Sequence, residues 1–141
     1  MKKIFLLIFV SFIGISCSLN DDTSDYYYEI LPVESYVLPP SFELGQTYTI
    51  TLKYKRPTDC HINRSLYFER NGKIRTVAIQ SLVSNGENCL FLPSEEPKEL
   101  KFQFEVVSPT PYIFKFYKGE DENGESLFES VTVEVTSPLT N

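Results

Sequence analysis

Few side chains in this sequence are suited to catalysis. His61 is the only histidine, and the cysteines are Cys17, Cys60 and Cys89. A single histidine marks no particular serine as the nucleophile of a Ser-His-Asp triad, and the Gly-x-Ser-x-Gly, Walker and His-Glu-x-x-His motifs are absent. Two cysteines and one histidine also lack the repeated ligand spacing of a zinc site. The sequence therefore predicts a protein that is not an enzyme and that carries no metal or cofactor.

Carboxylates are numerous, but their neighbours favour solvated charge. Glu95 and Glu96 stand between prolines, and the acidic stretch 119–125 contains Gly119 and Gly124. A two-carboxylate glycosidase needs its acids held on either side of a bond in a cleft. The stretch 119–125 offers oxygen ligands to calcium, but without the spaced twelve-residue loop of an EF-hand. A hairpin turn is the simpler interpretation, with calcium binding as the alternative.

The N-terminus has the layout of an export signal. Residues 1–3 are cationic, and the apolar run 4–15 that follows is interrupted only by Ser11 and Gly14. A helix that spans a bilayer needs about 20 apolar residues, so this run is too short. A positive start before a short apolar run is typical of a cleaved secretory signal.

The residues that follow resemble the bacterial lipobox, in which a small residue precedes a lipid-modified cysteine. Ser16 and Cys17 fit this pattern, whereas Gly14 stands where the family usually has an aliphatic residue. The resemblance implies a lipoprotein signal peptide over 1–16 and a diacylglycerol linked to the Cys17 sulfur. An ordinary signal peptide with a chance cysteine is the alternative.

Residues 17–25 are polar and acidic without periodicity, so we expect a flexible tether after the lipidated cysteine. The serine and the two aspartates behind Cys17 resemble the surface-export signal of Bacteroidota lipoproteins; a spacer without export meaning is the alternative. One domain over 26–137 and a short tail over 138–141 complete the predicted organisation.

The charge of the chain excludes some partners. Its formal net charge is −6, and cleavage after residue 16 would remove two lysines and leave −8. Nucleic-acid binding depends on lysine and arginine neutralising phosphates, so no nucleic acid is expected as a partner. The same charge disfavours anionic lipid surfaces, and we therefore expect membrane contact through the lipid on Cys17.

With Cys17 acylated, Cys60 and Cys89 remain as an even pair. An oxidising envelope favours a disulfide between them, with a reactive or metal-binding pair as the alternative. Closing this loop would stabilise the fold by about 3–4 kcal/mol on the chain-entropy model.

The elements that position these residues have the pattern of strands. The clearest is 47–55, where apolar residues alternate with threonine and lysine, and Asn71-Gly72 is a strong hairpin signal. Pro32 interrupts the first pattern and implies an edge strand. The other predicted strands are 26–31, 33–38, 62–70, 73–82, 89–92, 100–106, 112–117 and 127–135.

Seven to nine short strands with such turns predict an all-β fold, an antiparallel β-sandwich. The stretches 45–51 and 100–117 and the closing valine-rich strand resemble immunoglobulin-like and fibronectin-type domains. The chain departs from the antibody pattern because it has no tryptophan and because Cys60 lies in a loop. Lipobox, acidic tether and single sandwich together resemble flavobacterial-type lipoproteins of Bacteroidota. That resemblance implies the outer membrane of the cell envelope, with surface display as one possibility, and implies no activity.

The alternation also predicts which side chains are buried. The expected core residues are Ile50, Leu52, Leu100, Phe102, Phe104, Phe114, Phe116, Val131 and Val133. The expected exposed residues are Thr49, Lys53, Lys101, Gln103 and Lys115.

The candidate binding surface is the segment Tyr26-Tyr27-Tyr28. Neighbouring side chains of a strand face opposite ways, so at least one ring is expected to be exposed, with a tyrosine face in the core as the alternative. We therefore expect a non-enzymatic binding or accessory role toward an envelope protein or a glycan. The alternative function is a small carbohydrate-binding lipoprotein that assists polysaccharide uptake.

The lipid anchor is directly testable. Because the thioether requires the cysteine sulfur, Cys17→Ser is expected to abolish acylation and to move the protein out of the membrane fraction. Labelling with a tagged fatty acid and fractionation of the cells measure both effects. A wild-type protein that is soluble and has a free Cys17 thiol would contradict the lipobox interpretation.

Overall fold

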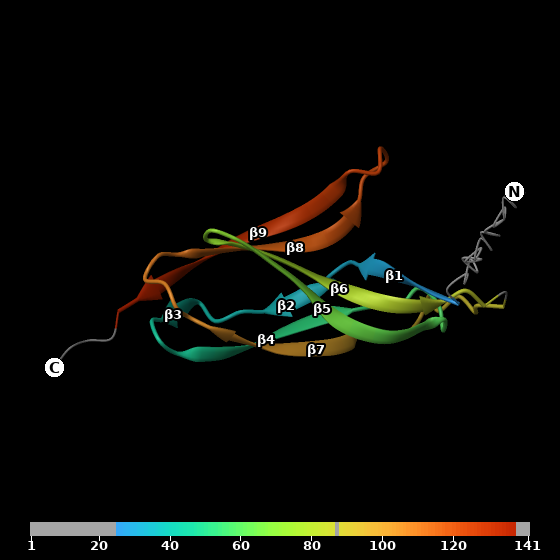
Figure 1. The fold of residues 1–141 in the computed structure, drawn as a ribbon, viewed down its shortest axis with the longest axis horizontal. Helices are drawn as coiled ribbons and strands as arrows, with labels where there is room; N and C mark the ends of the chain where they lie inside the picture. Colours follow the sequence, from blue (N-terminus) through green and yellow to red (C-terminus); the bar gives the residue numbers. More distant parts are fainter. Residues whose placement is uncertain (1–24, 87, 138–141) are drawn as a thin grey trace, which may run out of the picture.

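The computed structural model describes residues 25–86 and 88–137, and its regular structure is entirely β-strand (Figure 1). The prediction of an all-β sandwich is confirmed. No helix among these residues is long and apolar enough to cross a membrane. The signal segment 1–16, the tether from Cys17 to residue 24 and the tail 138–141 lie outside the described residues. The strands are β1 (Tyr26–Leu31), β2 (Ser35–Val37), β3 (Ser41–Glu43), β4 (Thr47–Tyr54), β5 (His61–Asn71), β6 (Ile74–Ser84), β7 (Lys98–Glu105), β8 (Tyr112–Glu120) and β9 (Ser126–Thr136).

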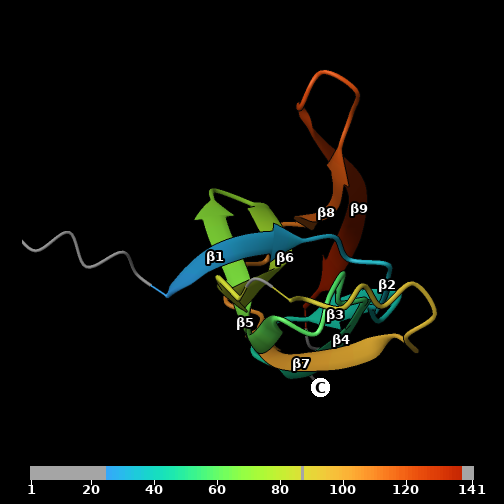
Figure 2. The ribbon, with the colours of Figure 1, turned by 90° about the vertical axis from the view of Figure 1, so that its right-hand side faces the viewer.

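The strands form two sheets of unequal size. The larger has six strands in the order β1-β6-β8-β9-β3, with β5 on β6 as well, and the smaller has the order β2-β4-β7. Because β5 pairs along nearly the whole of β6, the opposite edge of β6 is shared: β1 pairs with residues 79–84 and β8 with residues 74–77. Figure 2 shows the smaller sheet lying on one side of the larger one.

Five of the seven strand pairings are antiparallel, as the sequence predicts, and two are parallel. The parallel pairs are β3 with β9 and β6 with β8. Parallel neighbours cannot be joined by a tight turn, so they bring together segments far apart in the chain. The hairpin expected at Asn71-Gly72 joins β5 to β6, but its turn lies one residue later than predicted: Asn71 pairs with Ile74, and the turn residues are Gly72, at φ +57°, and Lys73.

Aromatic rings fill the space between the sheets. Phe104 from the smaller sheet contacts Tyr112 and Phe114 from the larger one, with ring centroids 5.0 and 5.2 Å apart. Phe42 on the short strand β3, which was not predicted, adds a ring whose centroid lies 5.3 Å from that of Phe104. These four side chains are almost completely buried. Edge-to-face contacts of this kind add to the stabilisation from burial alone.

The predicted strand registers are correct. The expected core residues are buried or half-buried, and four of the five expected surface residues are exposed. Lys115 is instead half-buried because its ammonium lies over the Phe128 ring, 4.7 Å from the centroid. The half-buried core residues are Leu100, Phe102 and Val131.

One side of the sandwich is closed where the chain crosses from the larger sheet to the smaller. Val33 N–H donates to the Tyr117 carbonyl and Glu34 N–H to the Lys53 carbonyl, each at 2.8 Å, so consecutive residues bond to opposite sheets. Just beyond, the Tyr36 ring stacks on Phe116 with centroids 3.9 Å apart.

The Tyr36 hydroxyl strengthens this closure. It donates to Glu129 Oε1 at 2.5 Å, and Lys118 Nζ lies 3.0 Å from Glu129 Oε2. Burial, followed by the hydrogen bond to Glu129, raises the pKa of Tyr36 to about 12. The hydroxyl therefore stays protonated as a donor at every ordinary pH.

The prediction of a strand over 89–92 is wrong. The segment makes one isolated bridge, between Thr58 and Phe91, and Leu90 and Phe91 are 68% and 71% exposed. Backbone hydrogen bonds from Asp59 to Leu90 and from Leu92 to Pro57 hold it against the loop before β5, outside both sheets. An apolar run predicted a buried strand, but the loop satisfies its backbone and leaves its side chains outside.

The aromatic core gives a stability test. Phe114 is fully buried, and Phe114→Ala is expected to lower the free energy of unfolding by about 3–5 kcal/mol through lost burial and a cavity. The matched control Phe91→Ala removes an exposed ring and should change it by less than about 0.5 kcal/mol. Urea unfolding followed by circular dichroism measures both. Equal effects at the two sites would contradict this description of the core.

Candidate functional site

The three tyrosines at the start of β1 are all exposed, with 47%, 47% and 67% of Tyr26, Tyr27 and Tyr28 accessible. The expectation of at least one exposed ring is confirmed, and the alternative of a tyrosine face in the core is wrong. Tyr27 points to the same side as the buried Leu31. Among the described strands, however, β1 pairs only with β6, and no strand of the smaller sheet pairs with β1. Binding by these rings stays a prediction.

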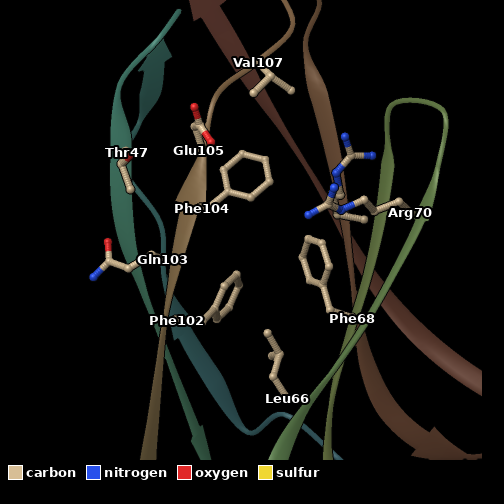
Figure 3. A pocket seen from close by; sticks show the side chains of 10 residues that line it. Thr47, Leu66, Phe68, Arg70, Phe102, Gln103, Phe104, Glu105 and Val107 are labelled. Atoms are coloured by element: carbon tan, nitrogen blue, oxygen red, sulfur yellow. The ribbon is translucent and has the colours of Figure 1, made fainter.

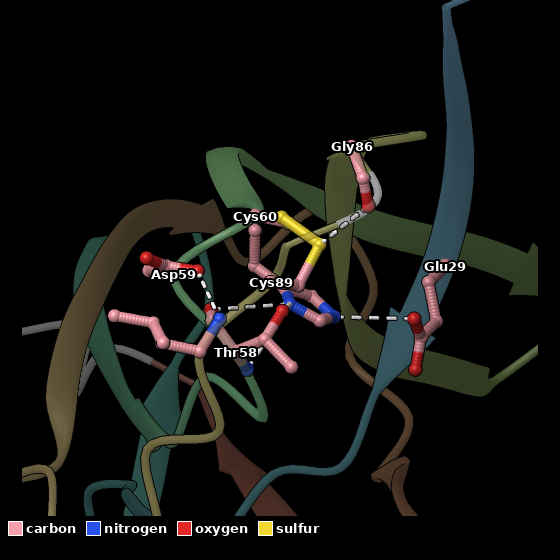
Figure 4. The surroundings of a disulfide bond; sticks show 8 residues. Glu29, Thr58, Asp59, Cys60, Gly86 and Cys89 are labelled. Atoms are coloured by element: carbon pink, nitrogen blue, oxygen red, sulfur yellow. Dashed lines mark hydrogen bonds and ion pairs between the residues drawn. A yellow bond between two sulfur atoms is a disulfide. The ribbon is translucent and has the colours of Figure 1, made fainter.

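The disulfide between Cys60 and Cys89 is present, as predicted, with Cα atoms 5.4 Å apart. It joins the start of β5 to the segment after β6, at the end of the domain where β1 begins (Figures 1 and 4). Asp59 Oδ1 accepts a 2.8 Å hydrogen bond from the Leu90 N–H and thereby reinforces the same junction. The bridge and this hydrogen bond fix the loop.

His61 has a structural role beneath this bridge. The side chain is 4% exposed, and Nε2 lies 3.1 Å from Glu29 Oε2. Nδ1 lies 2.9 Å from the Thr58 hydroxyl, so both ring nitrogens have partners. Figure 4 shows Glu29 and Thr58 beside the disulfide. Within residues 25–86 and 88–137, no group of three or more His, Cys, Asp or Glu side chains is placed to hold a metal ion.

Glu95 is not the solvated loop charge that the sequence predicts. It accepts from Arg56 Nε at 3.1 Å and lies 3.2 Å from Lys98 Nζ, with only 14% of its side chain exposed. The hydrogen bond from Arg56 lowers the pKa of Glu95 to about 2, and Lys98 contributes in the same direction. Arg56 is 39 residues away, so local composition gave no sign of the pair.

The acidic stretch 119–125 covers the last two residues of β8 and the β8–β9 hairpin turn, which confirms the simpler interpretation. Asp121 Oδ1 accepts hydrogen bonds from the N–H groups of Asn123 and Glu125 at 2.8 and 2.9 Å. These bonds lower the pKa of Asp121. Gly124 supplies the positive φ, +79°, that the turn requires. The Asp121 carboxylate is therefore used within the turn itself.

A concave surface lies between β5 and β7, and we call it the aromatic groove (Figure 3). It has a volume of about 470 Å³ and opens between the two sheets. Phe68 from β5 faces Phe102 and Phe104 from β7, with ring centroids 5.7 and 6.4 Å apart. Its lining residues are Thr47, Leu66, Phe68, Arg70, Arg75, Phe102, Gln103, Phe104, Glu105 and Val107.

Two arginines lie at one end of the aromatic groove. The Arg70 guanidinium carbon is 5.6 Å from the Phe68 ring centroid, and that of Arg75 is 4.9 Å from Tyr112. Arg75 Nη1 donates to the carbonyls of Gly72 and Ile74 at 2.6 and 2.8 Å. Arg75 is only 8% exposed, and this burial, with the nearby positive charge of Arg70, lowers its pKa.

Sequence reasoning missed the aromatic groove. Leu66, Phe68 and Arg70 alternate along one strand, so the sequence did contain the sign of a face that changes from apolar to cationic. What it could not show is that this face meets β7 across an open side.

In comparisons with protein-family models, curated proteins and solved structures, nothing matches this chain. Its function must therefore be argued from its own residues.

The Glu95 pair predicts a pH dependence. Because the folded-state pKa is about 2, below the ordinary 4.5, ionised Glu95 stabilises the fold above about pH 4.5, and this contribution is lost as the pH falls toward 2. Glu95→Gln should therefore lower stability at pH 7 and flatten its decline between pH 4.5 and 2. Thermal unfolding across that range measures the difference, with the exposed neighbour change Glu96→Gln as control. Parallel curves for wild type and Glu95→Gln would contradict the pairing.

Proposed function

We propose that this protein is a lipid-anchored protein of the cell envelope, held at the outer membrane through Cys17, whose β-sandwich binds a partner protein without catalysis. The observation that carries the binding role is the aromatic groove. Its walls include Leu66, Phe68 and Phe102. These side chains pack against the core on one side but remain half-buried because the groove is open on the other. Apolar concavities with a few charged groups at the rim are the usual form of binding sites.

The positions of the reactive side chains support binding over catalysis. Both nitrogens of His61 are used in contacts with Glu29 and Thr58, and Glu95 is held by Arg56 and Lys98. A general base must reach a substrate proton within hydrogen-bond distance in a cleft. Glu95 does not line the aromatic groove, and His61 lines a separate hollow of about 250 Å³, where both of its ring nitrogens already have partners.

The anchor sets where binding takes place. An extended tether of about eight residues reaches roughly 25–30 Å, so partners would be met close to the membrane. The described chain begins at Asp25, which accepts a 2.8 Å hydrogen bond from Asn85 N–H. The tether therefore joins the domain at its disulfide end, whereas the aromatic groove runs along the side between β5 and β7.

A site-specific crosslinking experiment in intact cells tests the proposed function. A photoreactive amino acid at Val107, which is 69% exposed on the groove rim, should capture a discrete partner. The same group at Leu127, which is 47% exposed on the β8–β9 hairpin, is the control and should not. No adduct at Val107, or the same adducts at both positions, would overturn the proposed role of this groove in binding a partner in the cell.

One observation favours the carbohydrate alternative. Tyr28 lines a shallow hollow of about 180 Å³ with Arg64, Ser65, Gln80 and Leu82, and a ring beside polar groups is suited to a sugar. Tyr26 and Tyr28 share one side of β1 while Tyr27 faces the other, so the three rings form no common platform. This arrangement makes glycan binding the second candidate.

Tyr28→Ala separates the two candidates. Because the ring is 67% exposed, the thermal midpoint should change little, whereas glycan retention in affinity electrophoresis should fall at least about tenfold if Tyr28 binds sugar. Tyr27→Ala, on the opposite face, is the matched control. Unchanged retention, or no retention by the wild type, would leave only the protein-partner proposal. A loss of several kcal/mol of stability would show that the ring is structural.

A further inference from the structure

The strands on either side of the aromatic groove have free edges. Among the described strands, β7 pairs only with β4, and β5 pairs only with β6. β7 is regular over its whole length, whereas the pairing of β5 shifts between His61 and Asn63. An extended peptide is the ligand that such an edge recognises, because backbone hydrogen bonds add it as one more strand.

The position of the groove favours addition at β7. The smaller sheet has three strands facing six, and β7 is its edge on the open side. A fourth strand beside β7 would extend the smaller sheet over the groove and toward β5. Alternate side chains of that strand would point inward onto Leu66, Phe68 and Phe102, the half-buried residues of the groove.

The two arginines specify the charge of the peptide. Among the described residues, neither Arg70 nor Arg75 forms an ion pair with a carboxylate. Glu105 also lines the groove, but it extends from β7 on the wall opposite Arg70 (Figure 3). A carboxylate is the group that a guanidinium pairs with most strongly, through paired hydrogen bonds. A ligand carboxylate at this end would also offset the repulsion between the two cations.

We propose that the aromatic groove binds an extended peptide that adds to the free edge of β7, places apolar side chains on Leu66, Phe68 and Phe102, and pairs a carboxylate with Arg70 and Arg75. This inference rests on the proposed binding function and names the chemistry of its partner. The carboxylate belongs to an acidic side chain or to a C-terminus, and the chemistry at the arginines is the same for both.

The test uses the full lipoprotein in nanodiscs and a displayed library of random ten-residue peptides. Enriched peptides should alternate apolar residues and carry an acidic group or a required free C-terminus near one end. The affinity of individual synthetic peptides is then measured. Each is compared with a version that lacks the carboxylate, through C-terminal amidation or an Asp→Asn change in the peptide. Arg70→Gln should weaken binding at least about tenfold, and loss of the peptide carboxylate should do the same.

The matched control is Lys101→Gln, which removes one positive charge from the exposed face of β7 and should leave affinity unchanged. Arg70 is exposed, so its change tests the charge without disturbing the buried Arg75. Hydrogen exchange on the wild-type complex provides an independent readout. Strand addition should slow exchange of β7 amides at the free edge, whereas a ligand held by side chains alone should not.

Several outcomes would overturn the proposal. They are equal affinity for wild type and Arg70→Gln, peptides bound without protection of β7, and no enrichment of any peptide from the library. A specific crosslink at Val107 together with any of these would retain the proposed function and reject the strand-addition chemistry. Absence of that crosslink together with peptide binding would reject the cellular role and retain the site.

Discussion

The rest of this structure depends on packing a three-stranded sheet against a six-stranded one. Phe104 carries the contact from the smaller sheet, and its ring centroid lies 5.3, 5.0 and 5.2 Å from those of Phe42, Tyr112 and Phe114 of the larger sheet. Burial of such rings is the main favourable term in a domain of this size. Three strands cannot cover six, so parts of the larger sheet must be protected in another way or remain open. The exposed hairpin of β8 and β9, which projects from the body in Figure 1, is one such part.

Each uncovered region has its own solution. On one side the chain itself crosses between the sheets, and Tyr36 covers Phe116 while bonding Glu129. At the disulfide end the interior becomes polar, and His61 and Glu29 replace an apolar layer with a hydrogen-bonded one. Within the part of the chain that the structure describes, the side between β5 and β7 has neither a crossover nor a polar layer, which leaves the aromatic groove. The groove thus has the same cause as the exposure of the β1 tyrosines: the smaller sheet has too few strands to cover the larger one.

The parts of the fold that could be predicted are those with local causes. Alternation along β4 and β7 gave the correct faces because side-chain direction in a strand follows from the backbone. Phe42 was missed because a three-residue strand shows no period, and the Glu95–Arg56 pair because its partners are 39 residues apart. The parallel contact of β6 with β8 and the groove beside β7 arise from tertiary packing, which no single segment encodes. The 89–92 run failed for the opposite reason: its local hydrophobicity was clear, but its loop partners decided its place.

Arg70 and Arg75 place local positive charge on a chain whose net charge is negative, and the two act on a ligand at different distances. A protein with formal net charge −6 repels anionic partners at long range, but charges in physiological salt are screened beyond about 8 Å. At contact distance the local pair decides, and Arg75 is held there by Gly72 and Ile74 carbonyls while Arg70 lies over Phe68. Attraction at contact combined with repulsion at distance disfavours polyanions, whose many charges meet the acidic surface. The same combination is compatible with a short apolar segment that carries a single carboxylate, the ligand proposed for the aromatic groove.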